Sequence, residues 1–314
     1  LGGANSPLYF SGGGMLGIIG TSLTSFGNHP VTFVSGVGLD IQDSGNTFTV
    51  AMPLNMGGNG FTKFGPGTVL LTAANIYTGS TALYGGTVKV DASQGGSLGV
   101  TAPTFSGGNL YLLGKASGTT NTTLGNVTVA QGGGVLTVDT KTGSGTYSLT
   151  LGTLGNVNTA GATLNILTNT HVSGTTSITT TTTPSGLTNV ILSGRYIYNG
   201  SDWATVSTAV TNNALSGYAS YSTVAAAANP TGTNTSNTEI TSSSGTGGTV
   251  TLGAGNWATN SLKLTSGSIL DLNAQTLTVT SGGLLFTGSG AYTIQNGTLN
   301  AGTGSMGTGT NTST

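Results

Sequence analysis

The chain has 314 residues, of which 56 are glycine and only 4% are charged. Globular domains carry about 25% charged residues, and the residues that favour helices are scarce here, so long amphipathic helices are not expected. Six basic and seven acidic residues give a net charge of −1, which argues against nucleic acid as a partner.

The apolar fraction of 35% argues against wholesale disorder and, with abundant threonine and β-branched residues, predicts an all-β protein. The chain has no cysteine, which excludes a disulfide framework and a cysteine metal site. No apolar run approaches the roughly 18 residues of a membrane span. Because no charged leader precedes the first strands, we expect a mature form or a piece of a longer precursor. A sparsely charged surface also favours self-association.

Residues 1–30 are rich in glycine and contain one apolar patch, formed by Met15, Leu16, Ile18 and Ile19. Two interpretations stay open for this segment. It is either the atypical first coil that caps a repetitive stack, or an arm that pairs with a neighbouring subunit by strand addition. In the second case the four apolar residues are the predicted assembly contacts.

Residues 31–170 contain many short apolar segments divided by glycine, and residues 61–90 show the pattern most clearly. Here Val69 to Leu71, Thr81 to Leu83 and Thr87 to Val90 are separated by Gly65-Pro66-Gly67 and Gly85-Gly86. Glycine permits sharp turns, and strands this short fit the sides of a coil that stacks on the next coil. The segment therefore predicts a β-solenoid.

The same segment resembles one copy of the autotransporter-associated β-strand repeat of large bacterial surface proteins. The matching residues are Thr62, Lys63, Gly65, Gly67, Thr68, Val69, Leu71, Asn75, Tyr77, Gly79, Thr81, Gly86, Thr87, Val88 and Val90. The chain departs from the repeat at Ala73 and Ser80, where the family usually has glycine. The resemblance covers about a tenth of the chain and implies a passenger-type β-helix on the bacterial cell surface or outside the cell.

Residues 171–256 interrupt the rhythm with threonine, asparagine and aromatic residues. We expect an excursion from the stack, and its aromatic residues Trp203, Tyr218 and Tyr221 are the predicted contacts with a ligand or partner. Residues 257–301 return to solenoid coils. Leucine and isoleucine recur there about every eight residues, which predicts that Leu262 stacks with Leu285, Leu270 with Ile294 and Leu277 with Leu299. Residues 302–314 read as a low-complexity linker.

Taken together, these patterns predict a right-handed parallel β-helix with three strands per coil and one non-repetitive excursion. Lys63, Lys89, Lys115 and Lys141 are evenly spaced, but their sequence contexts differ and a ladder of like charges is unfavourable. We therefore interpret the spacing as a coincidence.

Residues suited to catalysis are few. His29 and His171 lack a metal-binding spacing, and each is interpreted as a surface or turn residue. Asp40 and Asp43 form the closest acidic pair, but the segment lacks the ligand pattern of a calcium-binding loop and fits a polar turn better. No phosphate-binding motif is present. The sequence therefore predicts no enzyme activity, no cofactor and no metal.

The leading functional hypothesis is a non-catalytic extracellular structural protein that self-associates into a surface fibre, filament, sheath or biofilm matrix. The alternative is an adhesin whose aromatic excursion contacts glycans or cells. An enzyme that acts on polysaccharide is a third and weaker hypothesis, because such sites need clustered carboxylates. The expected partner in the first case is the chain itself.

Overall fold

The structure is a computed structural model, which describes residues 3, 5–155, 161–168, 174–181, 190–207, 213–225, 228–245, 248–265 and 267–301. It divides into two compact units. Unit 1 comprises Leu1–Gly155, Gly161–Pro184 and Ser207–Leu215, and unit 2 comprises Asn156–Ala160, Ser185–Val206 and Ser216–Thr314. His171 and the predicted linker at 302–314 lie outside the described residues.

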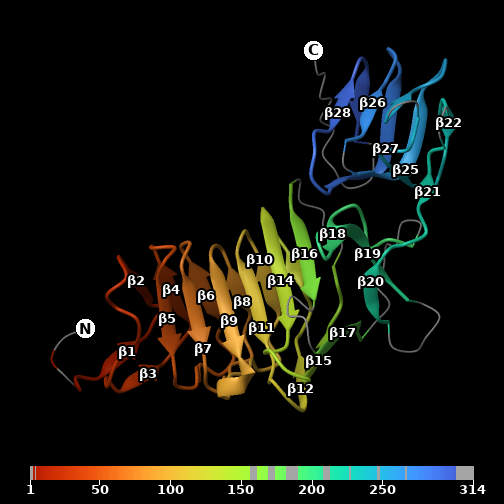
Figure 1. Ribbon diagram of the computed structural model, residues 1–314. Helices are drawn as coiled ribbons and strands as arrows, with labels where there is room; N and C mark the ends of the chain where they lie inside the picture. The colour runs from red at the N-terminus through yellow and green to blue at the C-terminus, as the bar shows by residue number, and fades with distance from the viewer. Residues whose placement is uncertain are drawn as a thin grey trace. The chain divides into compact units, whose positions relative to one another are not determined.

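Unit 1 is a stack of short parallel strands, which follow one another along the stack in chain order (Figure 1). One face of the stack contains β2 (Met15–Ile18), β4 (Val37–Ile41), β6 (Phe61–Phe64), β8 (Thr81–Leu83), β10 (Pro103–Phe105) and β13 (Thr128–Val129). A second face contains β5 (Thr47–Val50), β7 (Thr68–Leu71), β9 (Thr87–Asp91), β11 (Asn109–Leu113), β14 (Gly133–Asp139) and β16 (Thr163–Thr168). From β4 to β14, each coil thus adds one strand to each face.

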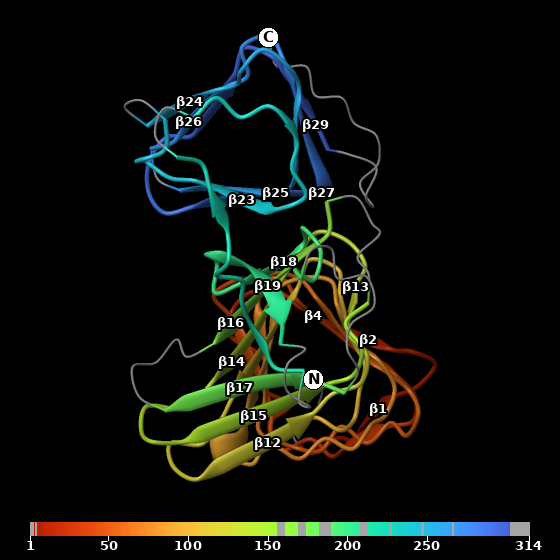
Figure 2. The same cartoon turned by 90° about the vertical axis from the view of Figure 1, so that its right-hand side faces the viewer.

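The remaining strands of unit 1 form two smaller sheets. Strands β1 (Leu8–Phe10) and β3 (Val31–Phe33) pair with each other, and β12 (Thr119–Thr123), β15 (Thr146–Leu151) and β17 (Thr175–Thr180) lie side by side (Figure 2). A short 3-10 turn, η1 (Ala92–Gln94), follows β9. Because β1 pairs with β3 and β2 with β4, residues 8–18 form part of the first coil.

Unit 2 is a second stack of parallel strands. One sheet contains β21 (Ser222–Thr223), β23 (Asn237–Ile240), β25 (Trp257–Thr265), β27 (Thr276–Thr287) and β29 (Thr298–Asn300), with β22 (Gly232–Thr233) also paired to β25. Another contains β24 (Thr249–Thr251), β26 (Ile269–Asp271) and β28 (Thr293–Gln295). Strands β18 (Tyr196–Tyr198) and β19 (Asp202–Val206) pair in antiparallel fashion, and β20 (Leu215–Gly217) follows them in the chain.

The predicted all-β fold with parallel coils is confirmed, and it places a column of apolar side chains inside unit 1. Phe48, Val69, Val88, Leu110, Leu136 and Ile166 occupy matching register positions on successive coils, and each is 0% exposed. A slip of one residue would turn a strand's apolar residues outward, at a cost of about 1.5–3 kcal/mol for each large side chain exposed. The alternation of apolar residues therefore fixes the register.

In unit 2, two of the three predicted stacking pairs are confirmed. Leu270 pairs with Ile294 and Leu277 with Leu299, but Leu262 pairs with Leu284 rather than with the predicted Leu285. The register of β25 against β27 is irregular here, because Thr259 pairs with Val279, 20 residues on, and Ser261 pairs with Gly283, 22 residues on. Between these pairs β27 has two more residues than β25, which a count of spacings along the sequence does not detect.

The range 171–256, expected to leave the stack, contains β17, which pairs with β15, and strands β21 to β24 of unit 2. The domain boundaries expected from the sequence at residues 30, 170, 256 and 301 stay predictions. No helix within the described ranges is long and apolar enough to cross a membrane.

Several residues of the repeat motif at 61–90 make polar contacts in the interior of the solenoid. The Asn75 side chain accepts a hydrogen bond from the Leu54 amide at 2.9 Å and donates to the carbonyls of Ala73 and Ser97. The buried Tyr77 hydroxyl lies 2.7 Å from the Thr81 hydroxyl, and burial raises its pKa. These side chains satisfy the backbone and each other where successive coils turn.

Lys63 is a further interior motif residue, with 0% of its surface exposed. Its ammonium group donates to the carbonyls of Phe64 at 2.5 Å, Gly65 at 2.7 Å and Gly85 at 3.3 Å, and so joins two successive turns. In the register, Lys63 stands beside Leu39 and Leu83, whereas Lys89 stands beside Leu70 and Tyr111. The regular spacing of lysines therefore produces no ladder of charges at Lys63 and Lys89.

Replacing Lys63 by methionine is expected to lower the free energy of unfolding by about 1–3 kcal/mol at neutral pH, because the three carbonyls lose their donor. The variant is also expected to change the pH dependence. Burial lowers the pKa of Lys63 to about 8, against the opposing charge of Asp40, from 10.5 in the unfolded chain. Between these values the unfolded state binds more protons, so wild-type stability rises with pH.

The Lys63→Met protein lacks this rise. Urea denaturation of both proteins at pH 7, 9 and 10.5 tests the prediction, since the other titrating groups are common to the two. A stability difference between the proteins that stays constant across this range would contradict the lowered pKa.

Candidate functional site

The predicted contact residues Trp203, Tyr218 and Tyr221 lie together in unit 2. Trp203 is on β19, is 1% exposed, and forms a buried cluster with Ile191 and Leu285, against which Tyr218 and Tyr221 pack half-buried. The indole ring is thus part of the core. Tyr218 and Tyr221 remain the members of the set that a partner can reach, and the contact role of the set stays a prediction.

Hydrogen bonds and ring contacts fix the two tyrosines beside β19. The Tyr218 amide donates to the Trp203 carbonyl at 2.8 Å, and the Trp203 amide donates to the Tyr221 hydroxyl at 3.1 Å. The two tyrosine rings meet edge to face with centroids 4.9 Å apart, a favourable aromatic geometry. The segment after β20 is therefore held against β19 by both its backbone and its side chains.

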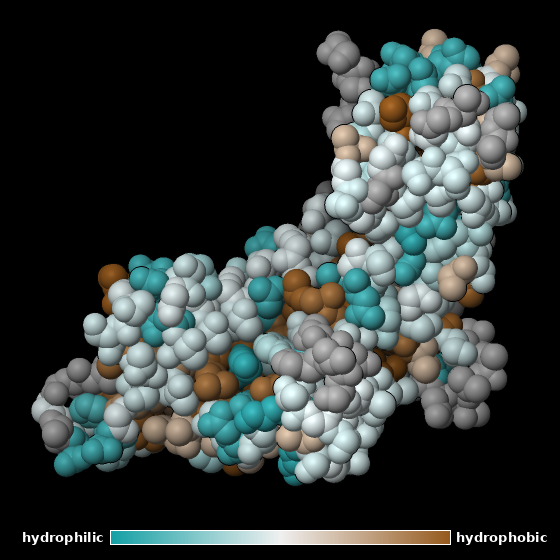
Figure 3. Space-filling model, in the orientation of Figure 1, coloured by the Kyte–Doolittle hydropathy of each residue, from teal (hydrophilic) through white to brown (hydrophobic). Residues whose placement is uncertain are grey.

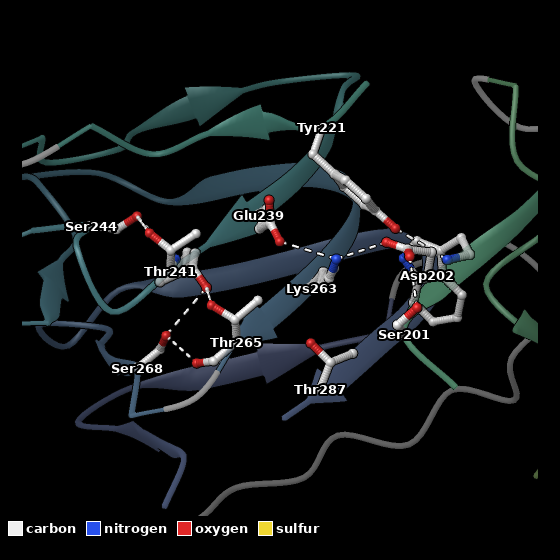
Figure 4. Close-up of polar contacts among 12 residues, drawn as sticks. Ser201, Asp202, Tyr221, Glu239, Thr241, Ser244, Lys263, Thr265, Ser268 and Thr287 are labelled. Atoms are coloured by element: carbon white, nitrogen blue, oxygen red, sulfur yellow. Dashed lines mark hydrogen bonds and ion pairs between the residues drawn. The ribbon is translucent and has the colours of Figure 1, made fainter. Parts of the chain in front are cut away.

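Beside these rings lies a cluster of charged side chains that sequence reasoning missed (Figure 4). The Lys263 Nζ on β25 lies 2.7 Å from Asp202 Oδ1 on β19 and 3.1 Å from Glu239 Oε1 on β23. The same ammonium lies 4.7 Å from the centre of the Tyr221 ring, within range of a cation–π interaction. The three charged side chains are 11–28% exposed.

The electrostatics of this cluster follow from its partial burial. Burial lowers the pKa of Lys263, but hydrogen bonds to Asp202 and Glu239 and the charges of both carboxylates outweigh it, so the pKa lies above its ordinary value. Burial raises the pKa of Tyr221, and the neighbouring Asp202 and Glu239 raise it further. The cluster thus holds one ammonium between two carboxylates, next to a neutral phenol.

The sequence carried a weak signal for this cluster. Glu239 and Lys263 occupy opposed positions on the adjacent parallel strands β23 and β25. Opposite charges on directly opposed residues stabilise a strand pair. Asp202 is far away in the sequence, so only the fold brings it to the pair.

A second surface lies on the outer side of β2, β4, β6 and β8 in unit 1. The rings of Phe64 and Tyr84 stack there with centroids 4.9 Å apart and planes within 5° of parallel, and Tyr84 is 47% exposed. A shallow groove runs from these rings across a floor of glycine, lined by Gly13, Met15, Gly36, Val37, Gly38, Gly60, Thr62, Phe64 and Tyr84. Of the lining glycines, Gly13 has open space at its Cβ position, whereas a Cβ at Gly36, Gly38 or Gly60 would meet atoms of a neighbouring coil.

Of the four predicted assembly residues, Met15 and Ile19 are 60% and 83% exposed, whereas Ile18 is buried and Leu16 is half-buried. Strand β2 pairs with β4 on one edge, and no partner strand lies on its other edge among the described residues. Such an edge can pair with another chain. On the face shown in Figure 3, apolar residues form small patches among weakly polar ones.

Asp40, Asp43, Asp91 and His29 make hydrogen bonds within unit 1. Asp43 accepts a hydrogen bond from the Gly45 amide, Asp40 accepts one from the Gln42 side chain, and His29 Nδ1 lies 2.8 Å from the Ser6 carbonyl. Asp91 caps η1 through Ser93, and its pKa is lowered because hydrogen bonds outweigh the effect of burial. No group of three or more metal-ligating side chains occurs within the described part of the chain.

Comparison with known proteins gives one relative of known name. The chain is 36% identical to the Adhesin BmaC autotransporter of Brucella suis biovar 1 (strain 1330) in an alignment 162 residues long, which covers 45% of this chain and 5% of that adhesin. The chain thus spans about a twentieth of the length of this relative. The resemblance to autotransporter passengers predicted from the sequence is confirmed.

No protein-family model matches the chain. No solved structure matches it either.

Proposed function

We propose that this chain is part of the passenger of a bacterial surface adhesin, in which a β-solenoid presents contact residues on its outer faces. The observation that carries the proposal is the in-register stack of parallel coils in a chain that resembles an autotransporter adhesin. A solenoid is quasi-one-dimensional and has long outer faces, which suits it to display a binding surface away from the cell. The proposed role is non-enzymatic and extracellular.

The contact surface that we favour is the groove beside Phe64 and Tyr84. Exposed aromatic residues contribute much of the free energy of binding at interfaces. The groove is concave, and none of the residues that line it is charged. A neutral glycan fits this chemistry, because an aromatic ring packs against the apolar face of a sugar while hydroxyl groups stay hydrated. Tyr218 is the corresponding candidate of unit 2.

The protein carrying Phe64→Ser and Tyr84→Ser together is expected to bind cells roughly tenfold or more weakly than the wild type. The measurement is attachment of beads coated with the 314-residue chain to cultured epithelial cells, before and after enzymatic removal of surface glycans. Tyr9→Ser is the matched control, because Tyr9 is 68% exposed and lies on β1, outside the groove.

Tyr218→Ser tests the surface of unit 2 in the same assay. Equal attachment of all four proteins would contradict both contact surfaces, and wild-type attachment that survives glycan removal would contradict the glycan as ligand.

Self-association into a fibre is the second candidate, favoured by the exposed Met15 and Ile19 and by the outer edge of β2, which has no partner strand within the described ranges. Electron microscopy of the same purified chain separates the two candidates. Regular filaments that disappear on replacing Met15 and Ile19 by serine support the fibre, whereas short single rods support the adhesin.

A further inference from the structure

Three groups that can react with one another meet at the charged cluster of unit 2. The Lys263 amine lies 2.7 Å from a carboxylate oxygen of Asp202, while Glu239 lies 3.1 Å away on the other side of the same nitrogen. Three different strands, β25, β19 and β23, supply them, so the arrangement depends on the fold (Figure 4). An amine, an acceptor carboxyl group and a second carboxyl group to carry protons are the components of amide formation.

We propose that Lys263 and Asp202 condense into an intramolecular amide bond, with Glu239 as the general acid and base. This covalent cross-link is distinct from the proposed adhesin function, and either can fail without the other. It makes unit 2 an autocatalytic modification site that needs no cofactor and no second substrate.

The reaction balances without an external reagent. The Lys263 ammonium first gives a proton to Asp202 across their hydrogen bond, which produces a neutral amine and a neutral carboxylic acid. The amine nitrogen then attacks the Asp202 carboxyl carbon and a C–N bond forms. Glu239 takes a proton from that nitrogen and returns it to a hydroxyl group on the carbon. The C–O bond breaks, one water molecule leaves, and Glu239 regains its starting state.

The surroundings support this chemistry in two ways. The fold holds the amine and the carboxyl group at contact distance, and such orientation replaces a bimolecular encounter by an intramolecular one. The Tyr221 ring lies over the ammonium, and the Tyr221 hydroxyl is fixed by the Trp203 amide. With the Lys263 side chain only 11% exposed, little water reaches the nitrogen, which limits the reverse reaction, hydrolysis of the amide.

The consequence is a covalent bridge between positions that are 61 residues apart in the chain. Such a bridge restricts the unfolded chain in the same manner as a disulfide, in a protein that has no cysteine. It also joins β19 to the stacked sheet of β23 and β25, so that this attachment survives when the surrounding contacts are broken.

Mass spectrometry of the purified, denatured 314-residue chain tests the proposal after incubation of the folded protein at pH 7 and pH 9. The intact mass is expected to be lower than that of the sequence by one water molecule. Trypsin cleaves after lysine and arginine, so an unreacted chain gives separate peptides 196–263 and 264–314. The cross-linked chain instead gives a single peptide 196–314, because the Lys263 amine is blocked.

Glu239→Gln and Lys263→Arg are the matched controls, each compared with the mass calculated from its own sequence. Glu239→Gln keeps both reacting groups and the shape of the proton carrier, and Lys263→Arg keeps a cation and a trypsin site. Both are expected to show the full mass and cleavage after residue 263, with circular dichroism like that of the wild type.

A wild-type protein with full mass and complete cleavage after Lys263 at both pH values overturns the proposal and leaves the cluster as an ion pair only. A wild-type mass lower by one water, with the linkage located between Asp202 and Lys263 by fragmentation, supports it. Loss of water in Glu239→Gln at the wild-type rate overturns the role of Glu239.

Discussion

Replacing Gly86 by alanine is expected to lower the free energy of unfolding of unit 1 by more than about 3 kcal/mol, enough to unfold much of it. Gly86 has a φ of +58°, which disfavours any side chain, and a Cβ placed there would lie 2.2 Å from the Gly67 carbonyl oxygen and 2.5 Å from that of Gly65. Both oxygens belong to the preceding coil. The Gly65 carbonyl also accepts a hydrogen bond from Lys63 and the Gly67 carbonyl accepts one from the Thr87 amide, so moving either oxygen breaks a hydrogen bond.

Gly57 provides a matched control, because its φ is +57° but a Cβ there would meet nothing within 4 Å. Gly57→Ala is therefore expected to cost only the about 1–2 kcal/mol of a left-handed conformation. Urea denaturation of both variants, followed by circular dichroism, separates the steric effect of the neighbouring coil from the conformational effect. Equal losses of stability in the two variants would show that contact between coils does not determine the requirement for glycine.

Replacing Trp203 by alanine is expected to cost about 3–5 kcal/mol, because a large fully buried side chain is removed from the cluster with Ile191 and Leu285. Hydrogen-exchange measurements should show this loss of stability as faster exchange of the backbone amides around β19. Any change in binding of a ligand is then expected to follow from that unfolding. Tyr221, whose hydroxyl accepts the Trp203 amide, should become more accessible in the variant.

Trp203→Phe is the conservative partner of this variant. Within the described part of the chain, the buried Trp203 Nε1 has no hydrogen-bond partner, so phenylalanine loses ring volume but no polar contact. We expect a destabilisation well below that of alanine. If Trp203→Ala keeps the thermal stability of the wild type and only weakens attachment to cells, then Trp203 is a ligand contact and its role in the core is wrong.

The repetitive part of the fold could be predicted from the sequence, because each of its determinants is local. Glycine pairs mark the turns, and apolar residues on successive coils fall into register, as the pairs Leu270–Ile294 and Leu277–Leu299 show. Where a coil is irregular, the local pattern is insufficient. Between Thr259 and Ser261 the register shifts by two residues, so that Leu262 pairs with Leu284, and nothing in the spacing of leucines indicates this shift.

The candidate sites were less predictable, because they depend on distant parts of the chain. In the sequence, a tryptophan among tyrosines in a polar segment indicates a contact surface. In the structure, however, Trp203 lies in the core of unit 2. No acidic residue lies close to Lys263 in the sequence, so the sequence gives no indication of its ion pair with Asp202. Phe64 and Tyr84 are 20 positions apart and become neighbours only because their coils stack.

The contacts of three turn glycines of unit 1 reach no further than the adjacent coil. The Cβ position of Gly86 faces Gly67, that of Gly79 faces Asn59, and that of Gly60 faces Ser80. Because each coil is fixed by the coil next to it, we expect a gene for such a protein to gain or lose whole coils more readily than parts of a coil. Related strains are expected to differ in length by whole coils, while single substitutions at these glycines are removed by selection.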